Sequence, residues 1–361
     1  MINIDGSYGE GGGQVLRTSL SLAAITGQAV RIERIRAGRK KPGLAAQHLT
    51  AVRAVAAICH AQVKGDTLGS TSLEFVPRSA VQASQYHFDV TAAQEGGSAG
   101  AVTLVLQTIL LPLAIATGNS EVTLRGGTHV PFSPPLTYIE RVYLPLLRQM
   151  GVVAEVKLNA WGWYPQGGGE VQLQVRGNSK LSEINLLEKG ELQQVRGLAV
   201  VTELPSHIPQ RMASRAENLL SQAHLKATVT PSREKGIAPG AGIFLTAKYA
   251  NTRAGFSALG RIGLAAEKAA EMVCAELLNF HDTGAPVDVH LADQLLLPAT
   301  LAIEPSQYRV AEISTHLTTN AWVIEQFGVA QVNIDVSEKV VAIAPLPQIP
   351  NLKSYKPKFQ T

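Results

Sequence analysis

Cysteine is scarce in this chain, since the 361 residues include only Cys59 and Cys274. Two cysteines exclude a framework of several disulfide bonds and any zinc site built from four cysteines. Such sparing use is typical of proteins kept in a reducing compartment, so we predict a cytoplasmic location. Aromatic residues are also few, at 5%, whereas glycine numbers 32 and proline 19. The composition therefore predicts many tight turns and a core of aliphatic side chains.

Long apolar runs are absent from the sequence, and we expect no secretory leader. The longest apolar run, from Ala101 to Thr117, is interrupted by Gln107 and Pro112 and falls short of the roughly 20 residues that a transmembrane helix requires. The first residues show no basic stretch followed by an apolar segment. We therefore expect no membrane partner, and no sequence feature points to an obligate protein partner.

Charge is low and slightly positive. Hydrophobic residues make up 45% of the chain and charged residues 17%, which excludes an intrinsically disordered protein. The formal net charge of +4 permits nucleic-acid binding but does not require it.

A unit with the order β-α-β-α-β-β recurs three times in the expected secondary structure. The first copy has strands at 2–5, 29–34, 72–76 and 86–90 and helices at 14–26 and 47–60. The second has helices at 99–117 and 135–150 and strands at 121–124, 152–157 and 170–175, with no clear opening strand. The third has strands at 287–290, 309–313, 331–336 and 339–343 and helices at 292–302 and 321–327. Alternating strands and helices are common in any α/β protein, but the recurring closing hairpin favours a true repeat.

The segment between the second and third copies follows a different order, β-α-β-β-α. We therefore predict a mixed α/β (α+β) fold in which three repeated modules surround a pseudo-symmetry axis, with a smaller inserted α/β domain. The predicted large catalytic domain comprises 1–185 plus 285–345, and the inserted domain comprises 186–284. A tail at 346–361, rich in proline and lysine, is expected to be extended.

The first motif is a glycine-rich turn, Gly9-Glu10-Gly11-Gly12-Gly13-Gln14, that leads directly into a helix. Free backbone N–H groups at a helix start suit a phosphate, and glycines allow its close approach. The turn lacks the Gly-Lys-Ser/Thr of a Walker loop and the third glycine of the dinucleotide fingerprint. A tight turn that serves packing alone is the alternative. Glu10 favours the phosphate site, because an acid beside a phosphate is repelled unless it holds Mg²⁺ or Mn²⁺.

The second motif is a basic run that ends at Pro42-Gly43. Its cations are opposed by Glu33 alone and are Arg31, Arg34, Arg36, Arg39, Lys40 and Lys41. Such a cluster favours binding of phosphate groups over a merely solvated strand edge. Arg17, Gln47 and His48 fall at helix positions that could face the same place.

The third motif places His316 after a strand and before Asn320, which we expect to cap the following helix. A helix N-terminus disfavours a protonated imidazole, and a neutral imidazole can act as a nucleophile. An ordinary loop histidine is the alternative. Asp293 either caps its own helix or lies beside His316, because we expect both at the carboxyl ends of strands in one copy.

Taken together, these segments resemble the RNA 3′-terminal phosphate cyclases over nearly the whole chain, from Asp5 to about Ile343. The matching segments are Asp5-Gly6, 9–17, 35–39, Pro42-Gly43-Leu44, Gln47-His48-Leu49, 104–108, Gly126-Gly127-Thr128, 164–169, Ala292-Asp293-Gln294-Leu295 and 314–320. This many matches in order is far more specific than any one of them.

The resemblance implies a three-step reaction. His316 attacks the α-phosphate of ATP and forms a covalent histidine–AMP. The AMP then passes to an RNA 3′-terminal phosphate to give RNA(3′)pp(5′)A. The neighbouring 2′-OH finally expels AMP and closes a 2′,3′-cyclic phosphodiester, with the advantage of an intramolecular reaction.

The resemblance also implies roles for the other site residues. Glu10 is expected to bind a divalent metal, Mg or Mn, at the ATP phosphates. The residues expected to line the ATP site are Gln107, Pro131, Asp293 and Gln294. The residues expected to hold phosphates or RNA are Arg17, Arg36, Arg39, Gln47 and His48.

The sequence departs from the family pattern at two positions. His290 stands where the family has an aromatic residue that stacks on adenine, and Trp161 stands where a basic residue is expected. Two other functions compete with the cyclase. A non-cyclising, cyclase-like protein of rRNA processing would lack the histidine nucleophile, so His316 argues against it. A pure RNA-binding module would not need Glu10, Asp293 and His316 together. Fold alone would not separate the cyclases from the enolpyruvyl transferases, which use the same repeated unit.

Overall fold

The computed structural model describes residues 1–93 and 98–347. Three of the four sheets in this part of the chain share one strand topology. The first sheet has the order β1 (Ile2–Asp5), β2 (Val30–Glu33), β4 (Leu73–Val76), β3 (Gln62–Lys64). The second has β5 (Gln85–Asp89), β6 (Ser120–Gly126), β8 (Gly169–Val175), β7 (Ala154–Ala160). The third has β9 (Asn185–Leu186), β14 (Ser306–Arg309), β16 (Val340–Pro345), β15 (Ala330–Asp335).

In each of these sheets the first two strands are parallel and the remaining pairs are antiparallel. The predicted mixed α/β class is therefore confirmed. The arrangement of the modules about a pseudo-symmetry axis stays a prediction.

The helices that accompany these sheets form a common core. They are α1 (Gly13–Thr26), α2 (Ala46–Cys59), α3 (Val102–Ile115), α4 (Leu136–Tyr138), α5 (Leu144–Gln149), α8 (Val289–Gln294), α9 (Leu296–Thr300) and α10 (Thr315–Gln326), with a 3-10 turn at Thr91–Ala93 and a π-helical turn at Ile139–Tyr143. Leu22, Val52 and Leu106 come from three of these helices and are fully buried in one apolar cluster. As expected, α1 ends at Gly27, whose φ of 70° is the left-handed conformation that glycine adopts readily. No helix within the described ranges is long and apolar enough to span a bilayer.

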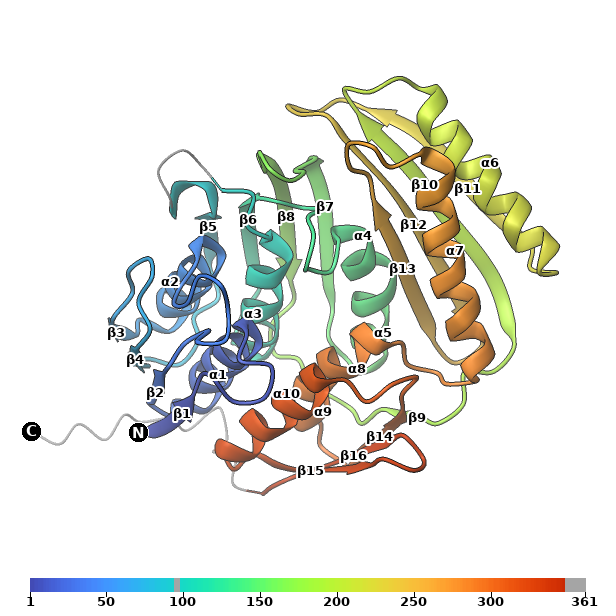
Figure 1. Ribbon diagram of the computed structural model, residues 1–361. Helices are drawn as coiled ribbons and strands as arrows, with labels where there is room; N and C mark the ends of the chain where they lie inside the picture. Colours follow the sequence, from blue (N-terminus) through green and yellow to red (C-terminus); the bar gives the residue numbers. More distant parts are fainter. Residues whose placement is uncertain (94–97, 348–361) are drawn as a thin grey trace, which may run out of the picture.

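The fourth sheet is formed by the chain segment between β9 and β14, two neighbouring strands of the third sheet. It has the order β11 (Ala227–Glu234), β10 (Leu192–Thr202), β12 (Gly240–Tyr249), β13 (Arg253–Leu259), and it is covered by α6 (His207–Gln222) and α7 (Ala266–Thr283). Figure 1 shows this sheet at the right, next to α4. Its apolar cluster, which includes Val195, Met212 and Leu245, is separate from the main core. The predicted domain limits stay a prediction, and most of the predicted tail, 348–361, lies outside the described residues.

Three sequence-based expectations about these elements were wrong. The strand near Tyr86 opens the second sheet by pairing in parallel with β6, whereas β3 completes the first sheet. The third sheet opens with β9, before the insertion, and not with a strand at 287–290. Asp288 instead caps α8, because its side chain accepts the N–H groups of His290 and Leu291. The last helix starts at Thr315, with Ser314 as its N-cap, so Asn320 lies inside the helix.

Candidate active site

The glycine-rich turn before α1 packs against the start of α10, which brings together residues from opposite ends of the chain. The backbone N–H of Glu10 donates to Thr319 Oγ1 at 3.1 Å. Gly9 has a φ of 58°, and a Cβ at this position would lie 2.1 Å from the same hydroxyl oxygen. Glycine is therefore required at position 9 both by the backbone conformation and by the close approach of α10.

Glu10 lies between a cation and the candidate nucleophile. Its Oε1 forms an ion pair with Arg39 Nη2, and its Oε2 lies 3.4 Å from His316 Nδ1. The Glu10 side chain is 17% exposed, whereas that of His316 is 51% exposed. His316 can therefore be reached by a substrate while one ring nitrogen faces a mostly buried carboxylate.

His316 occupies the first turn of α10, two residues after the N-cap Ser314. Partial burial, followed by the nearby cations Arg17 and Arg39, lowers the pKa of His316 below its ordinary value. The imidazole is therefore neutral at pH 7, the form in which a histidine can act as a nucleophile. The sequence predicted this neutral state, but it placed the helix start six residues too late.

His48 lies inside the predicted cluster of cations. The residue is buried, and burial, then Arg17, Arg36 and Arg39, hold the pKa of His48 well below its ordinary value. A Cβ on Gly13 would lie 2.3 Å from His48 Nε2 and 2.7 Å from Arg17 Nη1, so glycine at this position allows both side chains to reach the turn. A neutral ring among three guanidinium groups leaves net positive charge here, which suits phosphate groups.

Arg17 and Arg36 are each held by a neutral acceptor. Arg17 Nη2 donates to Gln14 Oε1 at 2.8 Å, and Arg36 Nη1 donates to the carbonyl oxygen of Gly43 at 2.7 Å. Burial lowers the pKa of Arg17 to about 10, and the charge of Asp293 opposes this change. Both guanidinium groups therefore stay charged at pH 7.

The short helix α8 brings Asp293 and Gln294 to the same region. Gln107 Nε2, from α3, donates to Gln294 Oε1 at 2.7 Å. Burial raises the pKa of Asp293 to about 7, although the neighbouring Arg17 opposes the rise. Asp293 does not cap its helix, because Asp288 does.

Asn320 is a site residue whose position the sequence predicted wrongly. It is 1% exposed, its Nδ2 donates to the backbone oxygen of Asp293 at 2.8 Å, and its Oδ1 accepts from Thr18 Oγ1 at 2.6 Å. It therefore joins α1, α8 and α10. The sequence favoured a cap because asparagine is common at helix caps. The signal that could have revealed its actual role is its position five residues after Thr315, on the buried side of α10.

Gln47, in α2, and Pro131, which follows Val130, are the two remaining predicted site residues near the start of α3. Gln47 Oε1 accepts the backbone N–H of Ala101 at 2.9 Å. Pro131 is exposed, and its neighbour Val130 packs with Ala101 in a small apolar cluster. The structure thus brings most of the predicted site residues around α1, α3, α8 and α10, whereas Pro131 lies at the edge of this group. Their individual roles stay predictions.

Comparison with known proteins agrees with this arrangement. A family model described as RTC: RNA 3′-terminal phosphate cyclase matches residues 8–334. The chain belongs to this family. A relative named RNA 3′-terminal phosphate cyclase from Nostoc punctiforme is 71% identical over 96% of this chain and 99% of its own length. Relatives with the same name from Methylococcus capsulatus and Sulfurisphaera tokodaii are 55% and 44% identical, over 94% and 93% of this chain and 94% and 96% of their own lengths.

Glu10 is the residue of this cyclase-family chain that suits a metal ion. Its Oε2 is buried and makes no hydrogen bond, and the 3.4 Å separation from His316 Nδ1 leaves this oxygen able to accept a cation. No group of three or more histidine, cysteine, aspartate or glutamate side chains that could hold a metal occurs among the residues that the structure describes. The donor set therefore fits an Mg²⁺ or Mn²⁺ ion that takes its other ligands from nucleotide phosphates and water.

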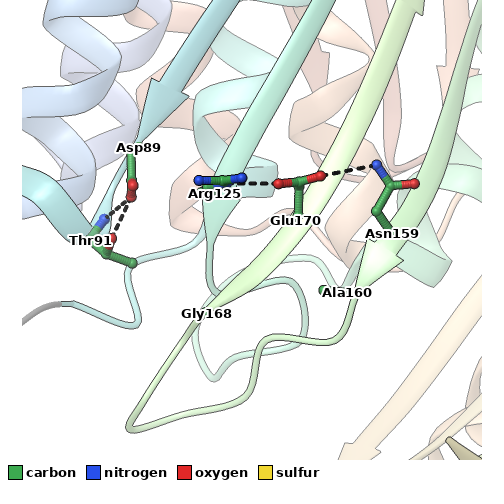
Figure 2. A pocket seen from close by; sticks show the side chains of 7 residues that line it. All are labelled: Asp89, Thr91, Arg125, Asn159, Ala160, Gly168 and Glu170. Carbon is green, nitrogen blue, oxygen red and sulfur yellow. Dashed lines mark hydrogen bonds and ion pairs between the residues drawn. The ribbon is translucent and has the colours of Figure 1, made fainter. Parts of the chain in front are cut away.

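A cavity of about 390 Å³ lies elsewhere, at the ends of β5, β6, β7 and β8 (Figure 2). Arg125 Nε donates to Glu170 Oε2 at 2.7 Å, and Asn159 Nδ2 donates to Glu170 Oε1 at 3.2 Å. The remaining lining residues are Asp89, Thr91, Ala160 and Gly168. The one arginine that lines this cavity is paired with a carboxylate, so the cavity lacks the free positive charge found near His316.

Proposed function

We propose that this protein is an RNA 3′-terminal phosphate cyclase. It converts an RNA 3′-terminal phosphate to a 2′,3′-cyclic phosphodiester and consumes ATP, as a ligase that forms a phosphoric ester. The observation that carries the proposal is the position of His316, half exposed in the first turn of α10 between Glu10 and the cations Arg17 and Arg39. Membership of the cyclase family supports the same reaction.

In the first step, His316 becomes adenylylated. The Nδ1 side faces Glu10, so Nε2 is the ring nitrogen left to attack the α-phosphorus of ATP. The new N–P bond replaces the bond to the bridging oxygen, and pyrophosphate leaves. Arg17 and Arg39 lie where they would offset the charge of the phosphates. A divalent metal ion, Mg²⁺ or Mn²⁺, would be held by Glu10 and would add further positive charge at the ATP phosphates.

The next two steps activate and close the RNA end. An oxygen of the RNA 3′-phosphate attacks the phosphorus of His316–AMP, which releases the imidazole and gives RNA(3′)pp(5′)A. The adjacent 2′-OH then attacks the 3′-phosphorus and expels AMP, which is a far better leaving group than an oxygen of a free phosphate. The cluster around His48, with Arg36, Arg39 and Gln47, would hold the RNA phosphate during these steps.

The nucleotide is assigned to the side of His316 formed by α3 and α8. Gln107, Asp293 and Gln294 line this side, and Pro131 would pack near the adenine. The exposed His290 stands where the family has an aromatic residue. At this position the nucleotide site therefore has an imidazole in place of the aromatic ring of other family members.

The location of the protein also belongs to the proposal. Cys59 and Cys274 are free and buried, which agrees with the reducing environment of the cytoplasm. The partners of the protein are then ATP and RNA with a 3′-terminal phosphate. The alternative, a non-cyclising relative that acts in rRNA processing, does not need a nucleophile and leaves the position of His316 unexplained.

The proposal is tested by trapping the first intermediate. The purified protein is incubated with α-³²P-labelled ATP and Mg²⁺, and the adduct is mapped by mass spectrometry. We expect acid-labile label on His316 and none in His316→Ala. His207→Ala is the matched control, because His207 is exposed at the start of α6 in the fourth sheet, and it should label fully. Label on a lysine, or undiminished label in His316→Ala, would contradict the proposal.

A further inference from the structure

Asp288 is a buried carboxylate outside the group of residues described above. It is 2% exposed and immediately precedes α8. Its Oδ1 accepts the backbone N–H groups of His290 at 3.0 Å and Leu291 at 2.9 Å. These two bonds satisfy donors that would otherwise be unpaired at the start of the helix, and they make Asp288 an N-cap.

The same carboxylate also binds two elements that are distant in the sequence. The hydroxyl of Tyr138, in α4, lies 2.9 Å from Oδ1 and 3.0 Å from Oδ2, and it donates to this carboxylate. The backbone N–H of Gly255, in β13 of the fourth sheet, donates to Oδ2 at 3.4 Å. A Cβ on Gly255 would lie 2.7 Å from the Tyr138 ring, so the ring packs directly on the β13 backbone. Asp288 thus joins α8 to the helix beside the second sheet and to the fourth sheet.

This junction determines how α8 is held. A helix of six residues has little stability of its own, so its orientation depends on its attachments. The carboxyl half of α8 is attached to α10 and α3 through Asn320 and Gln107. Tyr308 supports the middle, because its hydroxyl donates to the backbone oxygen of Ala292 at 2.7 Å. Asp288 holds the opposite end.

We propose that Asp288 and Tyr138 are positioning residues for the nucleotide site. Together they fix α8 against β13 so that Asp293 stays beside Arg17 and Gln294 stays beside Gln107. A simple cap requires only an acceptor for the backbone N–H groups, and serine serves as well as aspartate in that role. The bonds to Tyr138 and Gly255 exceed what a cap requires. They make the geometry of the ATP site depend on contact with the fourth sheet.

Two substitutions separate capping from positioning. Asp288→Ser keeps an N-cap acceptor but is too short to bind Tyr138, whereas Tyr138→Phe removes the hydroxyl and keeps the ring on β13. We expect each to raise the KM for ATP in the labelling of His316 by about tenfold, the effect of losing one hydrogen bond to a charged group, with little change in kcat. Because both substitutions break one interaction, the double variant should be no worse than Asp288→Ser alone.

Tyr249→Phe is the matched control. Tyr249 is 1% exposed and ends β12 of the fourth sheet, and its hydroxyl lies 3.0 Å from His281 Nδ1. This variant should lose a similar amount of thermal stability while its KM for ATP stays at the wild-type value. If Tyr138→Phe and Tyr249→Phe have the same KM, or if Asp288→Ser behaves as the wild type, Asp288 is only a helix cap and the proposal is wrong.

The inference rests on the proposed function, and a second measurement distinguishes the two failures. The dissociation constant of ATP is measured by calorimetry in the His316→Ala background, where no adduct can form. If the wild type takes no label but ATP still binds His316→Ala, the proposed reaction is wrong, and an affinity loss in Tyr138→Phe still supports the positioning role. If ATP does not bind at all, both proposals are wrong.

Discussion

Replacing Asp293 by asparagine should stabilise the protein while it damages nucleotide binding. Asp293 is the carboxylate whose pKa burial raises to about 7 from an ordinary value of 3.8, even with Arg17 nearby. A raised pKa means that the folded state disfavours the ionised form. At pH 8 the side chain is nevertheless ionised, so its charge is held in the fold at the expense of stability.

The size of the effect follows from the difference between the two pKa values. At about 1.4 kcal/mol for each pKa unit, the ionised carboxylate lowers the free energy of unfolding by about 4 kcal/mol at pH 8. This figure already includes the attraction of Arg17, because that attraction contributes to the pKa of Asp293. Asparagine has nearly the same shape and no charge. We therefore expect Asp293→Asn to unfold at a higher urea concentration than the wild type at pH 8.

The dependence of this gain on pH provides the test. The folded protein binds more protons than the unfolded chain between pH 3.8 and about pH 7, so the gain should be full above pH 7 and should shrink as the pH falls. It should be small near pH 4 and vanish about one unit below pH 3.8, where Asp293 is neutral in both states. Urea midpoints measured at pH 8, 7, 6 and 5 would show this. A loss of stability at pH 8, or a gain that does not change with pH, would refute the reasoning.

Asp335→Asn is the control of opposite sign. Hydrogen bonds from Ser337 and from the backbone of Glu338 lower the pKa of Asp335. This substitution should therefore not stabilise the protein at pH 8. A charge that destabilises the fold is characteristic of functional sites, which supports the proposed nucleotide role of Asp293.

Two further predictions concern the metal ion and the RNA. Glu10→Gln keeps the shape of the side chain and removes its charge, so labelling by ATP should fall strongly while the melting temperature stays within a few degrees; labelling that survives, or a loss caused by unfolding, would exclude the metal role. Replacing the exposed Lys40 and Lys41 by alanine should make the affinity for single-stranded RNA less dependent on salt, without changing His316 labelling. The slope of log affinity against log salt should fall by about 0.7 for each RNA phosphate that the protein no longer neutralises. An unchanged slope would show that these lysines bind no phosphate.

The sequence was sufficient to predict those helices and strands whose periodicity and end signals are strong. Helix α1 begins within one residue of the predicted start and ends at the predicted Gly27. The elements that were missed are those in which local pattern carries little information. β9 has two residues, too few to show alternation, and its partner β14 lies beyond the whole inserted segment. The β-branched residues Val287 and Val289 favour a strand, but the N-cap bonds of Asp288 decide for a helix.

The site was predictable to the extent that its chemistry is encoded in short segments. Glu10, Arg39 and His316 stand out by residue type and context, although the hydrogen bond between Glu10 and Thr319 joins positions 309 residues apart. The polar residues that support these groups give no such signal, because their roles depend on partners from other elements. Asn320 looks like a helix cap until Thr18 and the backbone of Asp293 are seen on either side of it. Asp288 is ordinary in sequence, and its importance arises only where Tyr138 and Gly255 meet it. The chemistry of this site is therefore local in the sequence, whereas its geometry is a property of how the modules and the fourth sheet pack.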